Sequence, residues 1–269
     1  MADVGDMDFV YRNAPLIEVI VEVRWKLFAL SAIPGGAVDP FFIEALPVFQ
    51  ENLRKIGYGH TERLVAGDFP LEMMPGQPIW RFRREPSLWP LYQLGPGLLT
   101  MNAVPPYRGW VHFRDMVSRG IEAVQGAYET VGGRINVERL ALRYLNSFTD
   151  KLGYGNHAEF LSNHLGLSVG VREGVESGVG SKWLERAVMA ELTAPLDEPA
   201  EATITIKAGN AHVEGSPACL FELAVARGGP GVADYGTWFD VARSSIHKVF
   251  NTMLSEELKE RIGPKDPVS

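Results

Sequence analysis

Residues 16–25 read LIEVIVEVRW, and this stretch decides the fold of the chain. Alternate positions are apolar and mostly β-branched, a period of two that is typical of a half-buried strand and not of a helix. The opposite row carries the charged residues Glu18, Glu22 and Arg24. We therefore expect a strand that turns one row toward the core, namely Ile17, Val19, Val21, Val23 and Trp25.

A second stretch, residues 137–146 (VERLALRYLN), repeats this alternation. Its apolar row is Leu140, Leu142 and Tyr144. Antiparallel pairing of the two strands would place Glu18 near Arg143 and Glu22 near Arg139, so that opposite charges face each other. Such pairs contribute only ~0.2–1 kcal/mol each, but they help to fix the register. We therefore predict that the two strands meet at the junction between two similar halves.

The rest of the chain predicts two rounds of the same element order. The first round continues with a helix over 40–56, strands over 63–69, 78–84 and 91–104, and a helix over 110–131. The second continues with a helix over 157–165, strands over 184–193, 202–208 and 218–226, and a helix over 238–262. A Tyr-x-x-Trp motif opens the closing helix of both rounds, at 107–110 and 235–238. A repeated order with a repeated landmark indicates an internal duplication.

Local signals refine this order at three places. Asp39-Pro40 is typical of a helix N-cap followed by proline in the first turn. Pro47 is expected to kink the first helix or to split it into two. The glycines at 95 and 97 mark a turn or a bulge inside the last strand of the first round.

We therefore expect an α+β fold made of two internally duplicated β-α-β-β-β(-β)-α units. Their strands would form one curved antiparallel sheet with helices on one face. This topology resembles the TATA-binding-protein-like and helix-grip folds. The expected boundaries are an N-terminal arm at 1–14, a first unit at 15–133 and a second unit at 134–269, packed as one continuous domain.

Composition narrows the classes of function. The chain has 269 residues, a net charge of −7 and an apolar content of 46%, which is typical of a globular protein. The acidic balance disfavours binding to bulk nucleic acid, since phosphate backbones attract basic proteins. No apolar run is long enough to span a membrane, and the single cysteine, Cys219, can form no internal disulfide, so a cytoplasmic location is expected.

The sequence predicts no metal, cofactor or catalytic residue. Its six histidines show no metal-ligand spacing. The glycine-rich stretch 166–181 lacks the spacing of a phosphate-binding loop. We interpret it as a surface loop, with a lid over a ligand or partner as the alternative. Cys219 has apolar neighbours and is expected to be buried in a strand.

The open face of the sheet, which the helices leave uncovered, is the expected binding surface. Its binding candidates include residues of both first strands and a basic cluster around 81–84, namely Glu18, Glu22, Arg24, Arg81, Arg83, Arg139 and Arg143. Such a mixed-charge face suits a protein partner, a second copy of the chain or a small ligand. The lead interpretation is a non-catalytic binding or interaction protein.

Two other functions stay open. The row Glu18-x-Ile20-x-Glu22-x-Arg24 is similar to the Glu-x-Glu-x-Lys strand of triphosphate-tunnel phosphohydrolases, although Ile20 stands where a carboxylate is needed. That resemblance implies hydrolysis of a nucleotide or polyphosphate with Mg²⁺ or Mn²⁺ held by carboxylates. The third interpretation is a nucleic-acid-binding module that uses the open face.

Four stretches of the chain resemble a family of sporadically distributed bacterial proteins of similar length. They are NAPLIEV at 13–19, PYRGWVHF at 106–113, LRYLN at 142–146, and IHKVF at 246–250 with LSEEL at 254–258. The resemblance covers nearly the whole chain but carries over no catalytic residue. The patchy distribution of the family implies an accessory role, in defence or on mobile elements, as a subunit or accessory factor of a bacterial complex.

Overall fold

The computed structural model describes residues 9–30, 36–67, 69–168, 189–229, 231–232 and 234–267. The chain divides into two compact units, and the division passes through strands β2 (Leu16–Trp25) and β9 (Val137–Phe148). Unit 1 comprises Met1–Glu18, Arg143–Val225 and Phe239–Ser269. Unit 2 comprises Val19–Leu142 and Ala226–Trp238.

Within the described residues the main sheet has nine strands, and its neighbouring strands with an assigned register are all antiparallel. The strand order is β10-β11-β12-β9-β2-β8-β7-β6-β5. The strands not yet introduced are β5 (His60–Arg63), β6 (Trp80–Arg83), β7 (Leu91–Gly95), β8 (Leu98–Ala103), β10 (Met189–Pro195), β11 (Ala202–Val213) and β12 (Ser216–Gly228). Two short pairs join β1 (Phe9–Tyr11) to β13 (Lys265–Pro267) and β3 (Phe28–Ala29) to β4 (Ala37–Val38).

The described helices are α1 (Phe42–Lys55), α2 (Gly109–Thr130), α3 (His157–Leu165), α5 (Tyr235–Met253) and α6 (Glu256–Ile262), with short 3-10 turns η2 (Leu71–Met73) and η3 (Asp150–Leu152). The fold is therefore α+β, as the sequence predicts. No described helix is long and apolar enough to cross a membrane.

Strand β2 has the predicted bounds, and Val19, Val21, Val23 and Trp25 are buried as predicted, whereas Leu16 is buried in place of Ile17. Strand β9 lies beside β2 in the sheet order. Within unit 2, Lys26 N donates to Asn136 O at 3.0 Å, and within unit 1, Ser147 N donates to Pro15 O at 2.7 Å. The partner numbers run in opposite directions, so the pair is antiparallel. Glu22 Oε1 lies 3.7 Å from Arg139 Nε, which confirms that expected ion pair.

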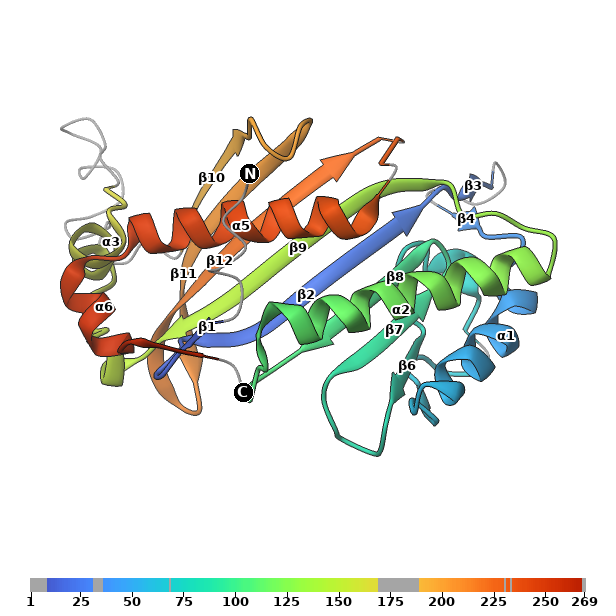
Figure 1. The fold of residues 1–269 in the computed structure, drawn as a ribbon, viewed down its shortest axis with the longest axis horizontal. Coiled ribbons are helices and arrows are strands. Elements are labelled where there is room, and N and C mark those ends of the chain that lie inside the picture. Colours follow the sequence, from blue (N-terminus) through green and yellow to red (C-terminus); the bar gives the residue numbers. More distant parts are fainter. Residues whose placement is uncertain are drawn as a thin grey trace. The chain divides into compact units, whose positions relative to one another are not determined.

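In unit 2, α1 and α2 cover one face of β6, β7 and β8 (Figure 1). Phe82 and Tyr92 lie opposite each other on β6 and β7 and therefore share this face. The ring of Phe49 in α1 packs edge-on against Phe82 at 5.3 Å, and Tyr92 Oη donates to Met116 O in α2 at 2.9 Å. The apolar residues that recur at helical spacing along the sequence of α2 are all buried: Trp110, Phe113, Val117, Ile121, Val124 and Tyr128.

Asp39 is not the N-cap of α1, contrary to the sequence prediction. The helix begins at Phe42, with Phe41 as N-cap and no side-chain cap. The Asp39 carboxylate is buried and accepts hydrogen bonds from Trp25 Nε1 at 2.8 Å, Tyr128 Oη at 2.5 Å and Gly97 N at 3.2 Å. One carboxylate oxygen of Asp39 therefore binds donors from outside the helix start, and the other accepts from Phe41 N at 3.2 Å.

Other details also differ from the prediction. Pro47 lies inside a single helix α1 and does not split it. The strand expected over 63–69 is β5, which begins earlier and ends at Arg63. The hydrogen bond from Leu64 N to Ile79 O continues its pairing by one residue. The helix expected over 238–262 is interrupted after Met253, since Ser255 Oγ accepts from Leu258 N and starts α6.

In unit 1, α5 lies over one face of β9 and β12 (Figure 1), and Phe160 of α3 contacts Phe148 of β9. A chain of aromatic contacts makes this core: the Phe148 ring lies 6.1 Å from Phe221 and 5.4 Å from Phe160, and Phe221 lies 6.3 Å from Phe250. Helix α3 has the predicted bounds. Most of the glycine-rich stretch at 166–181, from residue 169 onward, lies outside the described residues.

Cys219 lies in β12 and is fully buried, as predicted. Burial raises the pKa of its thiol to about 12. Because the thiolate is the reactive form, we expect a dithiobis-nitrobenzoate reagent at pH 8 to modify native protein at least ~100-fold more slowly than unfolded protein. Full unfolding in guanidinium should release one equivalent of chromophore. Rapid modification of the native protein would contradict this burial.

Candidate functional site

The predicted binding candidates of unit 2 lie on the sheet face opposite α1 and α2. Strand register places one polar row across five strands, namely Glu22, Thr100, Gln93, Arg81 and Glu62. The structure therefore brings Glu22, Arg24, Arg81 and Arg139 to the same face. Glu18 and Arg143 belong to unit 1, where Arg143 Nε pairs with Glu222 Oε1 at 2.8 Å.

The carboxylate of Glu22 is already engaged on this open face. Arg24 donates to it from Nε at 2.7 Å and from Nη2 at 3.0 Å, and also donates to Gly76 O at 2.9 Å. The Glu22 side chain is only 14% exposed. Within the described ranges no group of three or more His, Cys, Asp and Glu residues is arranged to hold a metal ion. A metal at Glu22 would have to displace the Arg24 guanidinium.

Glu62 forms the second ion-pair centre of the open face. It lies 3.1 Å from His60 Nε2, 3.4 Å from Arg81 Nη1 and 3.5 Å from Arg83 Nε. Burial alone would raise the pKa of Glu62, but the His60 hydrogen bond and the charges of Arg83 and Arg81 outweigh it and lower that pKa. The carboxylate therefore stays ionised and paired at neutral pH.

Arg83 connects this ion-pair centre to a pocket. Its side chain is 7% exposed, Nη1 donates to Leu88 O at 2.6 Å, and its guanidinium lies over the Trp89 ring at 5.1 Å. These contacts hold the β6–β7 loop, residues 84–90, in place. Arg83 is therefore a support for the pocket loop.

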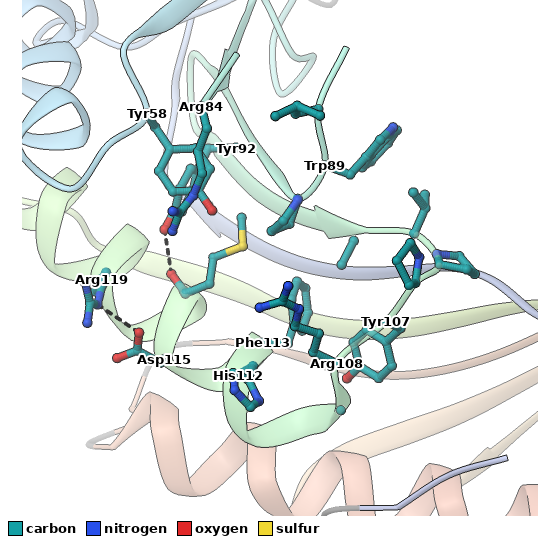
Figure 2. Close-up of a pocket in the computed structure, with 18 of the residues that line it drawn as sticks. Tyr58, Arg84, Trp89, Tyr92, Tyr107, Arg108, His112, Phe113, Asp115 and Arg119 are labelled. Atoms are coloured by element: carbon teal, nitrogen blue, oxygen red, sulfur yellow. Dashed lines mark hydrogen bonds and ion pairs between the residues drawn. The ribbon is translucent and has the colours of Figure 1, made fainter. Parts of the chain in front are cut away.

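The pocket lies entirely within unit 2 and has a volume of about 650 Å³ (Figure 2). We call it the α2 pocket, because the first three turns of α2 form one wall. The other walls are the turn after α1, the β6–β7 loop and the segment 103–108. Its volume lies in the range of about 300–1,000 Å³ that is usual for small-molecule sites.

The floor of the α2 pocket is apolar and largely aromatic. The buried side chains that form it are Tyr58, Tyr92, Ala103, Phe113 and Met116. The Tyr58 and Tyr92 rings meet edge to face at 4.7 Å, and the Tyr92 hydroxyl is fixed to Met116 O. Trp89, which is 40% exposed, stands at the rim. The floor is therefore a rigid surface for a flat apolar group.

The rim of the α2 pocket is basic. Three arginines line it, Arg84, Arg108 and Arg119, together with His112 and one carboxylate, Asp115. Arg119 Nε pairs with Asp115 Oδ2 at 2.9 Å. The Arg84 guanidinium lies over the Tyr58 ring at 5.1 Å. Within the described chain no carboxylate pairs with Arg84 or Arg108.

The start of α2 adds further donors to this rim. Arg108 occupies the N-cap position, no side chain caps the helix, and its first turn contains no acidic residue. The first backbone N–H groups of a helix have no partner within the helix and favour negative charge. In the α2 pocket, the start of this helix and the arginines both favour a negatively charged ligand.

Sequence reasoning missed most of the pocket residues. Two signals were present: Arg84 in the basic cluster at 81–84, and the motif Tyr107-Arg108-Gly109-Trp110, which can be interpreted as a stacking platform or a packing anchor. Trp110 is 1% exposed and has the packing role, whereas Tyr107 lines the pocket and contacts the Phe113 ring at 6.1 Å. Trp89 and Arg119 carried no sequence signal.

No family model, no curated protein and no solved structure matches this chain.

Proposed function

We propose that this is a binding protein and that it holds a small organic anion with a flat apolar portion in the α2 pocket. One observation carries the proposal: three guanidinium groups and a single carboxylate surround an aromatic floor, in a chain whose net charge is −7. An acidic protein that gathers positive charge at a concave, apolar site favours an anionic ligand there.

The open face supports the other two expected functions less well. Both metal-dependent hydrolysis and nucleic-acid binding would need charges of this face to contact a ligand. Glu22 is bound to Arg24, and Glu62 is bound to Arg81 and Arg83. Arg84 and Arg108 of the α2 pocket have no such carboxylate partner in the described chain. The pocket is therefore the better place for a ligand.

The duplication and the role in a bacterial complex are further parts of the proposal. Each half has a strand, a helix, a run of strands and a closing helix. In each half the first strand lies next to the last one, β2 beside β8 and β9 beside β12. This shared order supports duplication and a TATA-binding-protein-like or helix-grip arrangement. The accessory role, with a protein partner or self-association, rests on the sequence resemblance alone.

Anilinonaphthalene sulfonate (ANS), a fluorescent aromatic anion, tests the binding proposal directly. We expect saturable binding to a single site, and we expect Arg108→Ala to weaken it by about tenfold, since a charge-assisted hydrogen bond is worth ~1.5–3 kcal/mol. The combined variant Arg84→Ala/Arg108→Ala should bind more weakly still. Fluorescence titration at constant ionic strength measures both effects.

Arg134→Ala is the matched control for these variants. Arg134 is exposed, lies in unit 2 and is outside the pocket, so its loss changes the net charge equally but should leave ANS affinity unchanged. Equal weakening by Arg134→Ala would show a general charge effect. Binding that is insensitive to both pocket arginines would reject the α2 pocket as the site.

A further inference from the structure

We infer that the ligand of the α2 pocket is a phosphate monoester that carries a planar ring, of the nucleoside monophosphate type. This inference rests on the proposed function and specifies the chemical class of its ligand. It follows from the charge of the rim, from Arg84 and Arg108, which have no carboxylate partner in the described chain, and from the exposed ring of Trp89, which lines the same pocket.

The charge of the rim matches a dianion. Asp115 neutralises Arg119 through their 2.9 Å ion pair. Arg84 and Arg108 then leave two positive charges in excess. A phosphate monoester carries about −1.5 to −2 at pH 7, whereas a carboxylate or sulfonate carries only −1. A second phosphate would exceed the available positive charge, so the monoester fits best.

The two arginines approach the cavity from different walls (Figure 2). Arg84 follows the end of β6, and Arg108 stands at the start of α2. Guanidinium groups bind phosphate oxygens with two parallel N–H donors. A phosphate in contact with Arg108 would also face the N–H groups of the first turn of α2, where neither a side-chain cap nor an acidic residue competes.

The ring of the ligand has a defined place beside Trp89. Arg83 covers one face of the Trp89 ring at 5.1 Å, and its bond to Leu88 O fixes the loop. Leu88 and Trp89 are 47% and 40% exposed, although both line the pocket. A planar base stacked on Trp89 would cover this apolar surface, and stacking on an aromatic side chain accepts any base.

Competition against ANS on the full-length chain tests the inference. We expect AMP, GMP, CMP and UMP to displace ANS, and adenosine or inorganic phosphate alone to do so at least about tenfold less effectively. Calorimetric titration with AMP should give one site. Arg108→Ala should weaken AMP by about tenfold or more, and Trp89→Ala should weaken AMP while leaving inorganic phosphate unchanged.

The outcomes separate this inference from the proposed function. If ANS binds in an Arg108-dependent manner but no nucleoside monophosphate displaces it, the inference is overturned and the proposed function stands. Displacement by adenosine as effective as that by AMP also overturns the inference, because the phosphate would then contribute nothing. If ANS binding does not depend on Arg84 and Arg108, both the inference and the proposed function are rejected. The unfolding midpoint of each variant, with Arg134→Ala as control, verifies that the exposed substitutions leave the fold intact.

Discussion

Asp39→Ala is expected to lower the free energy of unfolding by about 3–5 kcal/mol. The carboxylate accepts bonds from Trp25 Nε1, Tyr128 Oη and Gly97 N, and its other oxygen accepts from Phe41 N at 3.2 Å. Alanine leaves three of these donors buried without an acceptor, and each unsatisfied donor costs ~1–3 kcal/mol. Burial, and then the Asp39 charge, raise the pKa of Tyr128, so its hydroxyl stays protonated and donates.

Guanidinium unfolding followed by tryptophan fluorescence measures this loss. Asp39→Asn should be intermediate, because its amide oxygen still accepts while its N–H₂ group faces other donors. Asp115→Ala is the control: that side chain is 62% exposed, and its ion pair with Arg119 is worth ~1 kcal/mol at most. An Asp39→Ala midpoint no lower than that of Asp115→Ala would show that the buried carboxylate is dispensable.

The periodic parts of the fold could be predicted from sequence, because burial repeats along a single element. The alternation in residues 16–25 gave the bounds of β2, and the helical spacing from Trp110 to Tyr128 gave the buried face of α2. The opposite charges of residues 22 and 139 predict an ion pair, and these side chains lie 3.7 Å apart. Each of these inferences depended on neighbours in sequence or on strand register.

The predicted boundaries were wrong where a contact with a residue far away in the sequence determined the local structure. Asp39 has a good capping signal, yet its carboxylate bonds with Tyr128, which lies 89 residues away. The break between α5 and α6 has a similar cause. Ser255 N donates to His164 O at 2.9 Å, and Ser255 Oγ lies 3.0 Å from His164 Nδ1 on α3. Such contacts override a local apolar stripe and leave no periodic signal.

The α2 pocket could not be predicted because it depends on packing between separate segments. Tyr58, the β6–β7 loop and the start of α2 come from three stretches of the chain. Alternation assigned Arg83 to the open face, but its long side chain extends to Leu88 and Trp89. The sequence pattern indicates on which face of the sheet a residue lies, but not where the end of a long side chain lies.

Gly95→Ala is expected to lower the free energy of unfolding by about 3 kcal/mol. A Cβ atom at Gly95 would lie 1.8 Å from Gln77 O and 2.8 Å from Gln77 C, both backbone atoms. That backbone cannot easily withdraw, since Ile79 N donates to Leu94 O and Gly76 N to Pro96 O, each at 2.9 Å. The sequence predicts a turn at this glycine, whereas the structure shows that close backbone approach also requires it.

Gly126→Ala provides the matched control for this prediction, because nothing lies within 4 Å of a Cβ at that position of α2. Alanine there should raise the free energy of unfolding by about 0.5–1 kcal/mol, through helix propensity and reduced unfolded-state entropy. The two substitutions add the same methyl group and should shift the guanidinium midpoint in opposite directions. A midpoint of Gly95→Ala that does not fall would mean that the 76–79 segment moves aside from Gly95, and that the β7–β8 hairpin is not held by it.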